Sequence, residues 1–272
     1  MIDSDNATVT QAALWQYPGI PIINSISAKK QSFESMLPLL KKFGCFVIAM
    51  CLDDSGIHKD SKKRIAIGMK LIDLLQQHGI DLTRIFIDPL ILAESAESGA
   101  ALETLKVIEH FAKEGIKTSI GLSNISFGLP QRKYINNVFL KLALKKGLYA
   151  AIVNPAAIDI DITKPFTNEE LLALDFLEGR DKNASHYIAY FGNSQQQLIQ
   201  KPISVNILEK IFSMVVEGNI DEIELAVRDA LNHYNPETIM NNALIAALEK
   251  VGELYSKGEY FLPQMIASAD TM

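Results

Sequence analysis

Polar side chains recur at the ends of apolar segments in the first half of this 272-residue sequence. Aspartate closes "MID" and "FID", and asparagine closes "IIN" and "GLSN". An ionised carboxylate can accept two hydrogen bonds from adjacent N–H groups, whereas an amide supplies one donor group and one acceptor. Such a set suits the edge of a flat heterocycle with alternating donors and acceptors. The four residues are Asp3, Asn24, Asp88 and Asn124.

The competing explanation for these residues is local turn formation, because Asp and Asn side chains readily bond to nearby backbone. It is the better explanation for one isolated residue. Four such residues at the same end of successive strands favour a shared site, since parallel α/β folds bind ligands at the carboxyl ends of their strands. By this argument the Asp53–Asp54 pair and Asn154 remain predicted turn residues.

The elements that must position these residues follow one repeating pattern. Short runs rich in β-branched residues alternate with amphipathic stretches of ten to twenty residues, which predicts βαβ units and a parallel sheet. Counted with the fragment "MIDS", the runs give five strands and part of a sixth; an open doubly wound sheet fits this number, and a closed barrel needs eight strands. The predicted strands cover 20–27, 45–53, 84–91, 117–124 and 150–155.

The pattern becomes helical after Pro155. We divide the chain into an α/β part (1–165), a helical connector with a polar linker (166–202) and a small antiparallel four-helix bundle (203–272). The third bundle helix is predicted to begin with Asn235 as N-cap and to end before Gly258, and the second to begin at an Asp221 cap.

Composition and motifs exclude several classes of function. A net charge of −6 argues against a nucleic-acid-binding surface, and no apolar run is long enough to span a membrane. The sequence has no P-loop, GxGxxG, HExxH or CxxC motif, and no metal site is expected. Cys45 and Cys51 lie well apart along one predicted strand, so reduced, buried thiols in a cytoplasmic protein are the simpler interpretation.

Five segments, "MIDS", "PIINSIS", "FIDPLI", "GLSNISFGLPQR" and "AIVNP", resemble the pterin-binding domain of the methyltetrahydrofolate-dependent, corrinoid-linked methyltransferases, which include cobalamin-dependent methionine synthase. The final segment, "GEYFLPQMIASADTM", resembles the helical cap that precedes the cobalamin-binding domain in methionine synthase and related corrinoid proteins. The two resemblances cover nearly the whole chain, in the order found in methionine synthase.

The resemblance implies an (α/β)8 TIM-type barrel, here incomplete, followed by the cap. It implies methyl transfer from 5-methyltetrahydrofolate to a cob(I)alamin or corrinoid carrier within methionine synthesis, with cobalamin bound mainly by a domain or partner outside this chain. Asp3, Asn24 and Asp88 would hold the pterin edge, and Asn124 would lie near N5, the atom that carries the methyl group. The residues expected to shield the corrin are Tyr260, Phe261 and Leu262.

The sequence also departs from the family pattern. About two βα units that precede "IDS" in the family barrel are not found, and neither is the DxHxxG segment that binds cobalamin. We therefore expect an internal piece of a methionine synthase-like protein or one part of a split enzyme, with another chain supplying the missing strands. The alternative function is a non-catalytic scaffold or docking module for a corrinoid protein, which includes the case of an inactive truncated fragment. A dihydropteroate synthase-type enzyme is a weaker third possibility, because "AIVNPAAIDI" carries no basic phosphate-binding motif.

Overall fold

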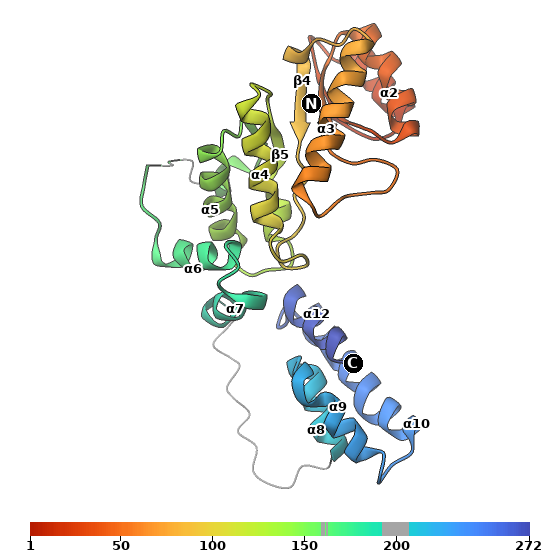
Figure 1. The fold of residues 1–272 in the computed structure, drawn as a ribbon, viewed down its shortest axis with the longest axis vertical. Helices are drawn as coiled ribbons and strands as arrows, with labels where there is room; N and C mark the ends of the chain where they lie inside the picture. The colour runs from red at the N-terminus through yellow and green to blue at the C-terminus, as the bar shows by residue number, and fades with distance from the viewer. Residues whose placement is uncertain (159–160, 162, 192–206) are drawn as a thin grey trace.

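We describe the protein from a computed structural model, which places residues 1–158, 161, 163–191 and 207–272. The predicted polar linker falls largely on residues 192–206 and so lies outside the described residues. An α/β unit is followed by two connecting helices and then by a helical C-terminal unit (Figure 1).

The strands of the α/β unit follow one another in space as they do in sequence. β1 (Ile2–Asp3), β2 (Ile22–Ser27), β3 (Phe46–Met50) and β4 (Ile85–Asp88) form one parallel sheet in that order. β5 (Ser119–Gly121) and β6 (Ala150–Ile152) form a second parallel pair, and a parallel bridge between Ile87 and Thr118 joins the two sheets. Doubly wound sheets reverse their strand order at a switch point, so this order is that of an incomplete TIM-barrel wall.

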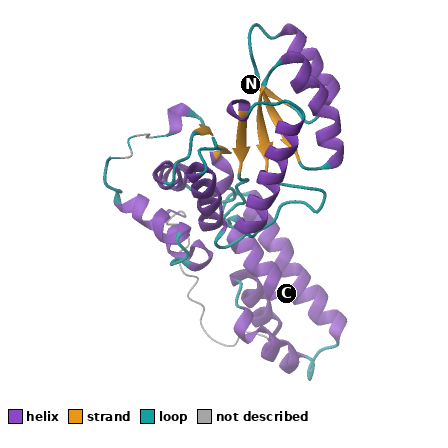
Figure 2. Ribbon diagram, turned by 45° about the horizontal axis from the view of Figure 1, so that its top comes forward, coloured by secondary structure: helices purple, strands orange, loops and turns teal. Residues whose placement is uncertain are grey.

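The helices between the strands cover one face of this wall (Figure 2). Apolar side chains of β2, β3 and β4, among them Ile23, Val47 and Ile85, share a buried cluster with Leu40 and Leu71 of the helices. A second cluster surrounds β5 and the helices beside it. The helices are α1 (Ala7–Gln16), α2 (Lys30–Phe43), α3 (Ser61–Gln77), α4 (Ala100–Lys113) and α5 (Arg132–Lys145), with short 3₁₀ turns η1 (Leu82–Arg84), η2 (Leu122–Ser126) and η3 (Pro155–Ala157).

Two helices, α6 (Asn168–Leu177) and α7 (Ser185–Phe191), follow the last strand, with the 3₁₀ turn η4 (Lys182–Ala184) between them. Thr167 and Glu170 form a capping box at the start of α6, a pattern that stabilises the first turn of a helix. Glu170 also pairs with Lys141 of α5 at 3.1 Å, and both side chains are buried. This ion pair and the surrounding apolar cluster attach the connector to the wall.

The C-terminal unit is entirely helical within 207–272. Ile211 and Met214 pack against Ala226, Ala230 and Ala243 in its core. The helices are α8 (Ile207–Glu217), α9 (Ile220–Ala230), α10 (Pro236–Ile239), the π-helical turn η5 (Met240–Ile245), α11 (Ala246–Ser256) and α12 (Leu262–Thr271). No helix in the described part of the chain is both long and apolar enough to cross a membrane.

The structure tests the predicted ends of these helices. Asn235 caps α10 by accepting from the backbone N–H of Thr238, and Gly258 follows α11 with φ of 72°, so both predictions are confirmed. The predicted Asp221 cap is wrong, because α9 begins at Ile220 with Asn219 at the cap position. Asn219 has no capping hydrogen bond to its side chain, so this helix end lacks the signal on which the prediction relied.

Substitution of Gly68 with alanine should destabilise the protein. A Cβ at this position of α3 would lie 2.6 Å from Cζ of Phe111 and 2.9 Å from Sγ of Cys51, both in the buried core. Overpacking of this kind costs about 1–3 kcal/mol. The matched control is Gly252→Ala in α11, where nothing lies within 4 Å and the change should stabilise by about 0.5–1 kcal/mol. Urea denaturation measures both, and equal effects at the two sites would contradict the packing argument.

Candidate functional site

Strand register places three of the four predicted residues on one face of the wall. Asp3 pairs with Asn24, and Asn24 pairs with Ile48 of β3. Two residues further along β3, Met50 pairs with Asp88. Paired residues share a face, as do residues two apart along a strand. Asp3, Asn24 and Asp88 therefore lie on the face opposite the helix-covered core.

Asn124 reaches this face by a different route. The predicted strand 117–124 ends at Gly121, and Asn124 lies in the 3₁₀ turn η2, so its placement in a strand was wrong. One residue beyond the Ile87–Thr118 bridge, Ser119 stands level with Asp88, and Gly121 is two residues further on the same face. The amide nitrogen Nδ2 of Asn124 lies 3.7 Å from the position that a Cβ of Gly121 would take. Its side chain thus folds back over the inner face.

Asp88 is the carboxylate with the most unusual environment in this group. Burial raises its pKa from 3.8 to about 6, although a hydrogen bond from the backbone N–H of Leu90 favours the ionised form. That N–H lies 2.8 Å from Oδ1 of Asp88. A carboxylate with a pKa near neutrality titrates over the range in which many binding sites operate.

Side-chain hydrogen bonds show which of the predicted residues serve local turns, and Asp88 is among them through the backbone N–H of Leu90 that its Oδ1 accepts. Asp53 accepts from the backbone N–H of Ser55, and Asn154 accepts from that of Ala156, so both serve local turns as predicted. Within the described residues, the side chains of Asp3, Asn24 and Asn124 make no such bond. Local turn formation therefore does not account for these three, whose donors and acceptors are free for a ligand.

The opposite end of the inner face is aromatic. The ring of Phe86 lies 6.1 Å from that of Phe46 and 5.8 Å from that of Tyr149, measured between centroids. Nζ of Lys117 lies over both Phe86 and Tyr149, at 5.5 and 5.3 Å from their centroids. This aromatic cluster at the amino ends of the strands leaves the carboxyl ends as the polar end of the inner face.

The loops that carry Asp88 and Asn124 are bonded to each other, which the sequence did not reveal. The backbone N–H of Glu94 donates to the carbonyl of Ile125 at 3.3 Å, and Oγ of Ser95 donates to the carbonyl of Phe127 at 2.7 Å. Arg132 donates to Oγ of Ser126 at 3.0 Å from the start of α5. These contacts join loops from separate strands, and the only sequence signal was the polar composition of both loops.

Glu94 also anchors the start of α4. Its carboxylate oxygens accept from the backbone N–H groups of Gly99 and Ala101, each at 2.6 Å. Burial raises the pKa of Glu94 to about 7, against the lowering effect of these two bonds. Because both oxygens are engaged by the helix, this carboxylate holds the loop and is less suited to binding a ligand.

The three residues predicted to shield a corrin are engaged within the chain. Tyr260 is buried, and its hydroxyl donates to the carbonyl of Val216 at 2.9 Å. Phe261 packs against the apolar cluster around β5, and the backbone N–H of Leu262 donates to the carbonyl of Gly128 at 3.0 Å. A Cβ on Gly128 would lie 2.3 Å from Cβ of Leu262, so only glycine allows this approach.

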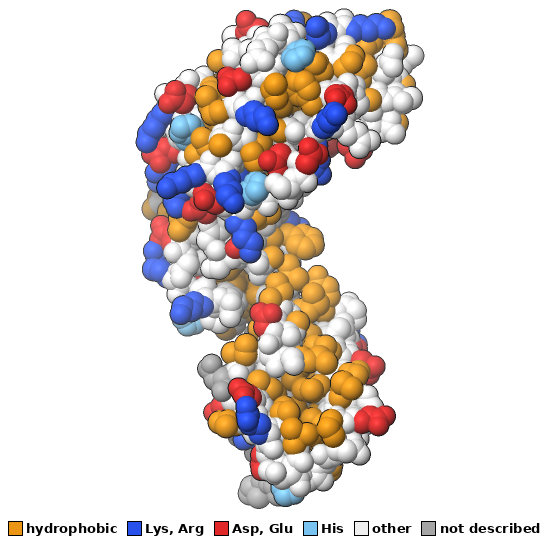
Figure 3. Space-filling model, turned by 45° about the vertical axis from the view of Figure 1, so that its right-hand side comes forward, with side chains coloured by type: hydrophobic (Ala, Val, Ile, Leu, Met, Phe, Trp, Pro, Cys, Tyr) orange, Lys and Arg blue, Asp and Glu red, His pale blue; other side chains and the backbone are white. Residues whose placement is uncertain are grey.

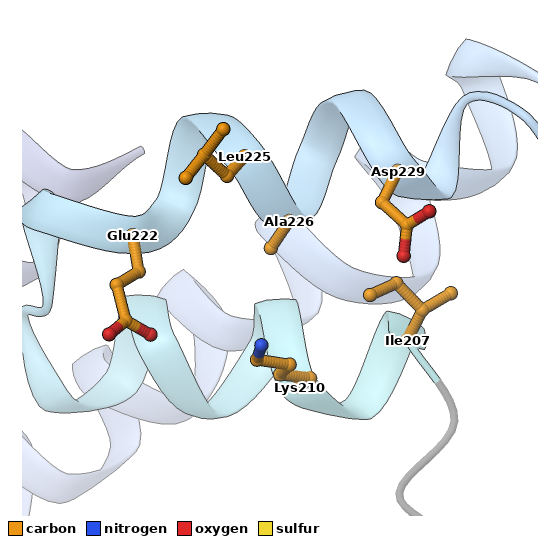
Figure 4. Close-up of a pocket in the computed structure, with 6 residues that line it drawn as sticks. All are labelled: Ile207, Lys210, Glu222, Leu225, Ala226 and Asp229. Atoms are coloured by element: carbon orange, nitrogen blue, oxygen red, sulfur yellow. The ribbon is translucent and has the colours of Figure 1, made fainter.

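A separate cavity of about 340 Å³ lies between α8 and α9 (Figure 4). It contains none of the predicted site residues, and its lining combines apolar and charged side chains without a shared geometry toward one point. The lining residues are Ile207, Lys210, Glu222, Leu225, Ala226 and Asp229.

The α/β unit is a wall of parallel βα units with carboxylates and amides at its carboxyl ends, an arrangement that suits a flat ligand with donors and acceptors along its edge. Comparison with known families agrees: residues 1–154 match the family described as pterin binding enzyme, and residues 207–272 match a B12 binding domain. The chain belongs to the pterin-binding enzyme family. The two matches also follow the division between the α/β and helical units.

Individual relatives point the same way. The chain is 28% identical to methionine synthase of Mycobacterium tuberculosis and 28% identical to that of Mycobacterium leprae, over its whole length. It spans only about a quarter of those proteins, 25% and 24% of their lengths. It is 30% identical to the methylcorrinoid:tetrahydrofolate methyltransferase of Eubacterium limosum, over 70% of this chain and 69% of that protein.

Ionisation of Asp88 should make stability depend on pH. Its pKa is higher in the folded protein than in the unfolded chain, so the folded state binds more protons between about pH 4 and pH 6. The resulting stabilisation is complete below pH 3.8 and is lost as the pH rises through 6. Asp88→Asn removes this pH dependence. The free energy of unfolding of the variant, compared with that of wild type, should therefore rise by about 2 kcal/mol between pH 4 and pH 7.

Urea denaturation at several pH values measures this difference. Asp53→Asn is the control, because hydrogen bonds from Ser55 lower the pKa of Asp53 and its contribution is lost instead as the pH falls. An Asp88→Asn profile parallel to that of wild type would show that Asp88 does not titrate in this range.

Proposed function

We propose that this chain carries the pterin-binding part of a methyltransferase that moves a methyl group from 5-methyltetrahydrofolate to a corrinoid carrier, cob(I)alamin, in methionine synthesis. The observation that carries the proposal is the shared inner face of Asp3, Asn24, Asp88 and Asn124, in a chain that matches a pterin-binding family followed by a B12 binding domain. Buried, reduced Cys45 and Cys51 favour a cytoplasmic setting.

In this proposal Asp3, Asn24 and Asp88 bind the polar edge of the pterin ring. The ring offers adjacent N–H groups, which an ionised Asp accepts, and a neighbouring acceptor, which an Asn amide can satisfy. Since Leu90 occupies Oδ1 of Asp88, the carboxylate still offers Oδ2 to the ligand. The fit is one of hydrogen-bonding capacity, and the absence of a net positive charge on these residues suits a neutral ring.

Asn124 would act at N5 of the folate. A tetrahydrofolate nitrogen leaves poorly unless it gains a proton as its bond to the methyl group breaks. An amide that bonds N5 more strongly as the proton arrives stabilises the transition state more than the bound substrate. Asn124 is exposed on the 3₁₀ turn η2, and its side chain makes no hydrogen bond to the described residues, so it is free to take this role.

The helical unit 207–272 would be the cap of the corrinoid domain, a small four-helix bundle in which η5 joins α10 to α11. The B12 binding domain match supports this assignment. Tyr260, Phe261 and Leu262 would cover the corrin once Phe261 and Leu262 leave their contacts with the barrel. Figure 3 shows hydrophobic side chains gathered over the lower half of the molecule, where this unit lies, and exposed apolar residues such as Leu225 and Leu231 could meet the corrinoid domain.

The wall would be completed by further parallel strands between β6 and β1, supplied by the same polypeptide or by another chain. Both edge strands lack a second neighbour among the described residues. Apolar side chains of the β6 edge, Tyr149 and Ile152, are exposed. Unpaired strand edges are templates for further pairing.

A docking module without catalysis is the second candidate, favoured by the exposed apolar residues of the helical unit. Folate binding separates the two candidates. A pterin site predicts that 5-methyltetrahydrofolate raises the melting temperature, because a ligand that binds only the folded state stabilises it. At one hundred times its dissociation constant the gain is about 2.7 kcal/mol. Asp88→Asn should lose most of this gain, and no response in wild type would favour the docking module.

Asn124→Ala should slow methyl transfer while weakening folate binding much less. Removal of one group that stabilises developing charge typically costs about 10²–10³ in rate. The assay follows the methyl group of labelled 5-methyltetrahydrofolate to added cob(I)alamin. Asn154→Ala is the matched control, because Asn154 caps η3 and should leave the rate unchanged. A normal rate in Asn124→Ala would exclude its role at N5.

A further inference from the structure

Arg64 is a fully buried cation that neither the sequence pattern nor the proposed chemistry uses. It lies on α3, in the segment "SKKRIAIG", and its exposed fraction is 0%. Its side chain takes part in no ion pair with a carboxylate among the described residues. A buried charge without a carboxylate partner is costly unless hydrogen bonds compensate it. The hydrogen-bond acceptors of the Arg64 guanidinium therefore indicate its role in the fold.

Its hydrogen bonds go to neutral oxygens, and two of the four reach the same loop. Nη1 lies 2.7 Å from the carbonyl oxygen of Leu90, 3.1 Å from that of Pro89 and 3.2 Å from Oγ1 of Thr104. Nη2 lies 3.2 Å from the carbonyl oxygen of Lys59. The guanidinium thus holds the two residues that follow Asp88 directly at the end of β4.

The held loop has a conformation that an L-residue rarely adopts. Leu90 has φ of 62°, in the left-handed region, which costs a residue with a Cβ of the order of 1 kcal/mol. In this conformation the Leu90 carbonyl turns toward Arg64 while its N–H turns toward Oδ1 of Asp88, at 2.8 Å. The peptide unit after Leu90 thus bonds to the guanidinium, and the peptide unit before Leu90 bonds to the carboxylate. The two groups are connected through this one residue.

We infer that Arg64 is a positioning residue for the pterin site: it fixes the Pro89–Leu90 backbone so that the Leu90 N–H holds one oxygen of Asp88 and leaves the other directed to the ligand. The inference rests on the proposed function in taking the ligand to be a reduced folate. A preorganised carboxylate binds more tightly, because the cost of ordering it is met on folding. Arg64 itself touches no ligand.

The titratable and charged groups around this arrangement come from the end of β3, the start of α3 and α4. Cys51 follows β3 and interacts with both Asp88 and Arg64, but burial raises its pKa far above neutrality, so it remains a neutral thiol. The charges of Glu103 and Asp60 act on Arg64 and favour its protonated form, but neither carboxylate forms an ion pair with it among the described residues. Nη1 instead donates its hydrogen bonds to the backbone carbonyls of Pro89 and Leu90.

The decisive variants are Arg64→Met, Arg64→Lys and Thr104→Val. Methionine fills the space without a donor. Lysine keeps the charge but lacks a second nitrogen, so it cannot bond to the loop carbonyls of Pro89 and Leu90 and also, as Nη2 does, to the carbonyl of Lys59. Thr104→Val is nearly isosteric and removes one acceptor of Nη1, together with the hydroxyl donor that lies 2.9 Å from the carbonyl oxygen of Ala100 and 3.4 Å from that of Leu90. It is a milder change that should fold even if Arg64→Met does not. Lys141→Met is the matched control, because it removes another buried cation on α5, remote from Asp88.

The first measurement needs no ligand. In protein labelled with ¹⁵N-leucine, the Leu90 amide signal, identified by its absence in Leu90→Gly, should move with the ionisation of Asp88, with a midpoint near pH 6 in wild type. This movement should be lost in Arg64→Met, reduced in Arg64→Lys and Thr104→Val, and unchanged in Lys141→Met. A wild-type titration of the Leu90 signal in the Arg64 and Thr104 variants would overturn the inference.

The second measurement is the dissociation constant for 5-methyltetrahydrofolate. It should rise roughly tenfold in Arg64→Met, as expected when an ordered side chain becomes free, and should stay unchanged in Lys141→Met at a comparable loss of melting temperature. A purely structural role predicts a lower melting temperature with unchanged affinity in both. If wild type binds no folate, the proposed function fails, while the Leu90 signal still decides whether Arg64 positions Asp88.

Discussion

In-register pairing of parallel strands is the constraint on which the candidate site depends. Asp3 pairs with Asn24, and Met50 pairs with Asp88, so three polar residues separated by up to 85 positions share one face of the wall. A register slip of one residue on any of these strands would turn its polar residue into the apolar core. The buried partners on the other face, such as Ile23 and Ile87, make such a slip costly because they would enter the polar face.

The alternation of strands and helices in this fold could be predicted from the sequence, because apolar runs and helical periodicity are local patterns. These local patterns could not decide between an open doubly wound sheet and a barrel wall, since that choice depends on which strands become neighbours. The family resemblance indicated an incomplete barrel, and the strand order agrees with it. The parallel bridge from Ile87 to Thr118, which keeps the strands in sequence order, has no local signal. Asn124 shows the same limit: its residue type indicated a ligand, whereas its position in a 3₁₀ turn over Gly121 depended on where β5 ends.

Arg64 is a second residue whose role could not be predicted from the sequence. In "SKKRIAIG" it stands among lysines and has the appearance of a solvent-facing residue. It is buried because α3 packs against the wall where the β4 loop needs donors for its two carbonyl groups. Helical spacing with Ile67 and Leu71 places Arg64 on the buried face of α3, but the carbonyls that it bonds belong to another element, so its role could not be predicted from α3 alone. The same reasoning applies to Glu94, whose two oxygens serve the first turn of α4.

Burial at the polar end of the inner face also explains why two of its four residues are uncharged amides. Asp88 is held where burial raises its pKa to about 6, and further buried negative charge beside it would raise that pKa again. Amides at Asn24 and Asn124 provide donors and acceptors without this repulsion.

Because the loops after β4 and β5 are bonded through Glu94 and Ser95, a shift in one of them is passed to the other. Leu262 donates to the carbonyl of Gly128 in the second loop, so the helical unit is bonded to the same segment that carries Asn124. The position of the cap and the placement of the amide are in this way mechanically connected.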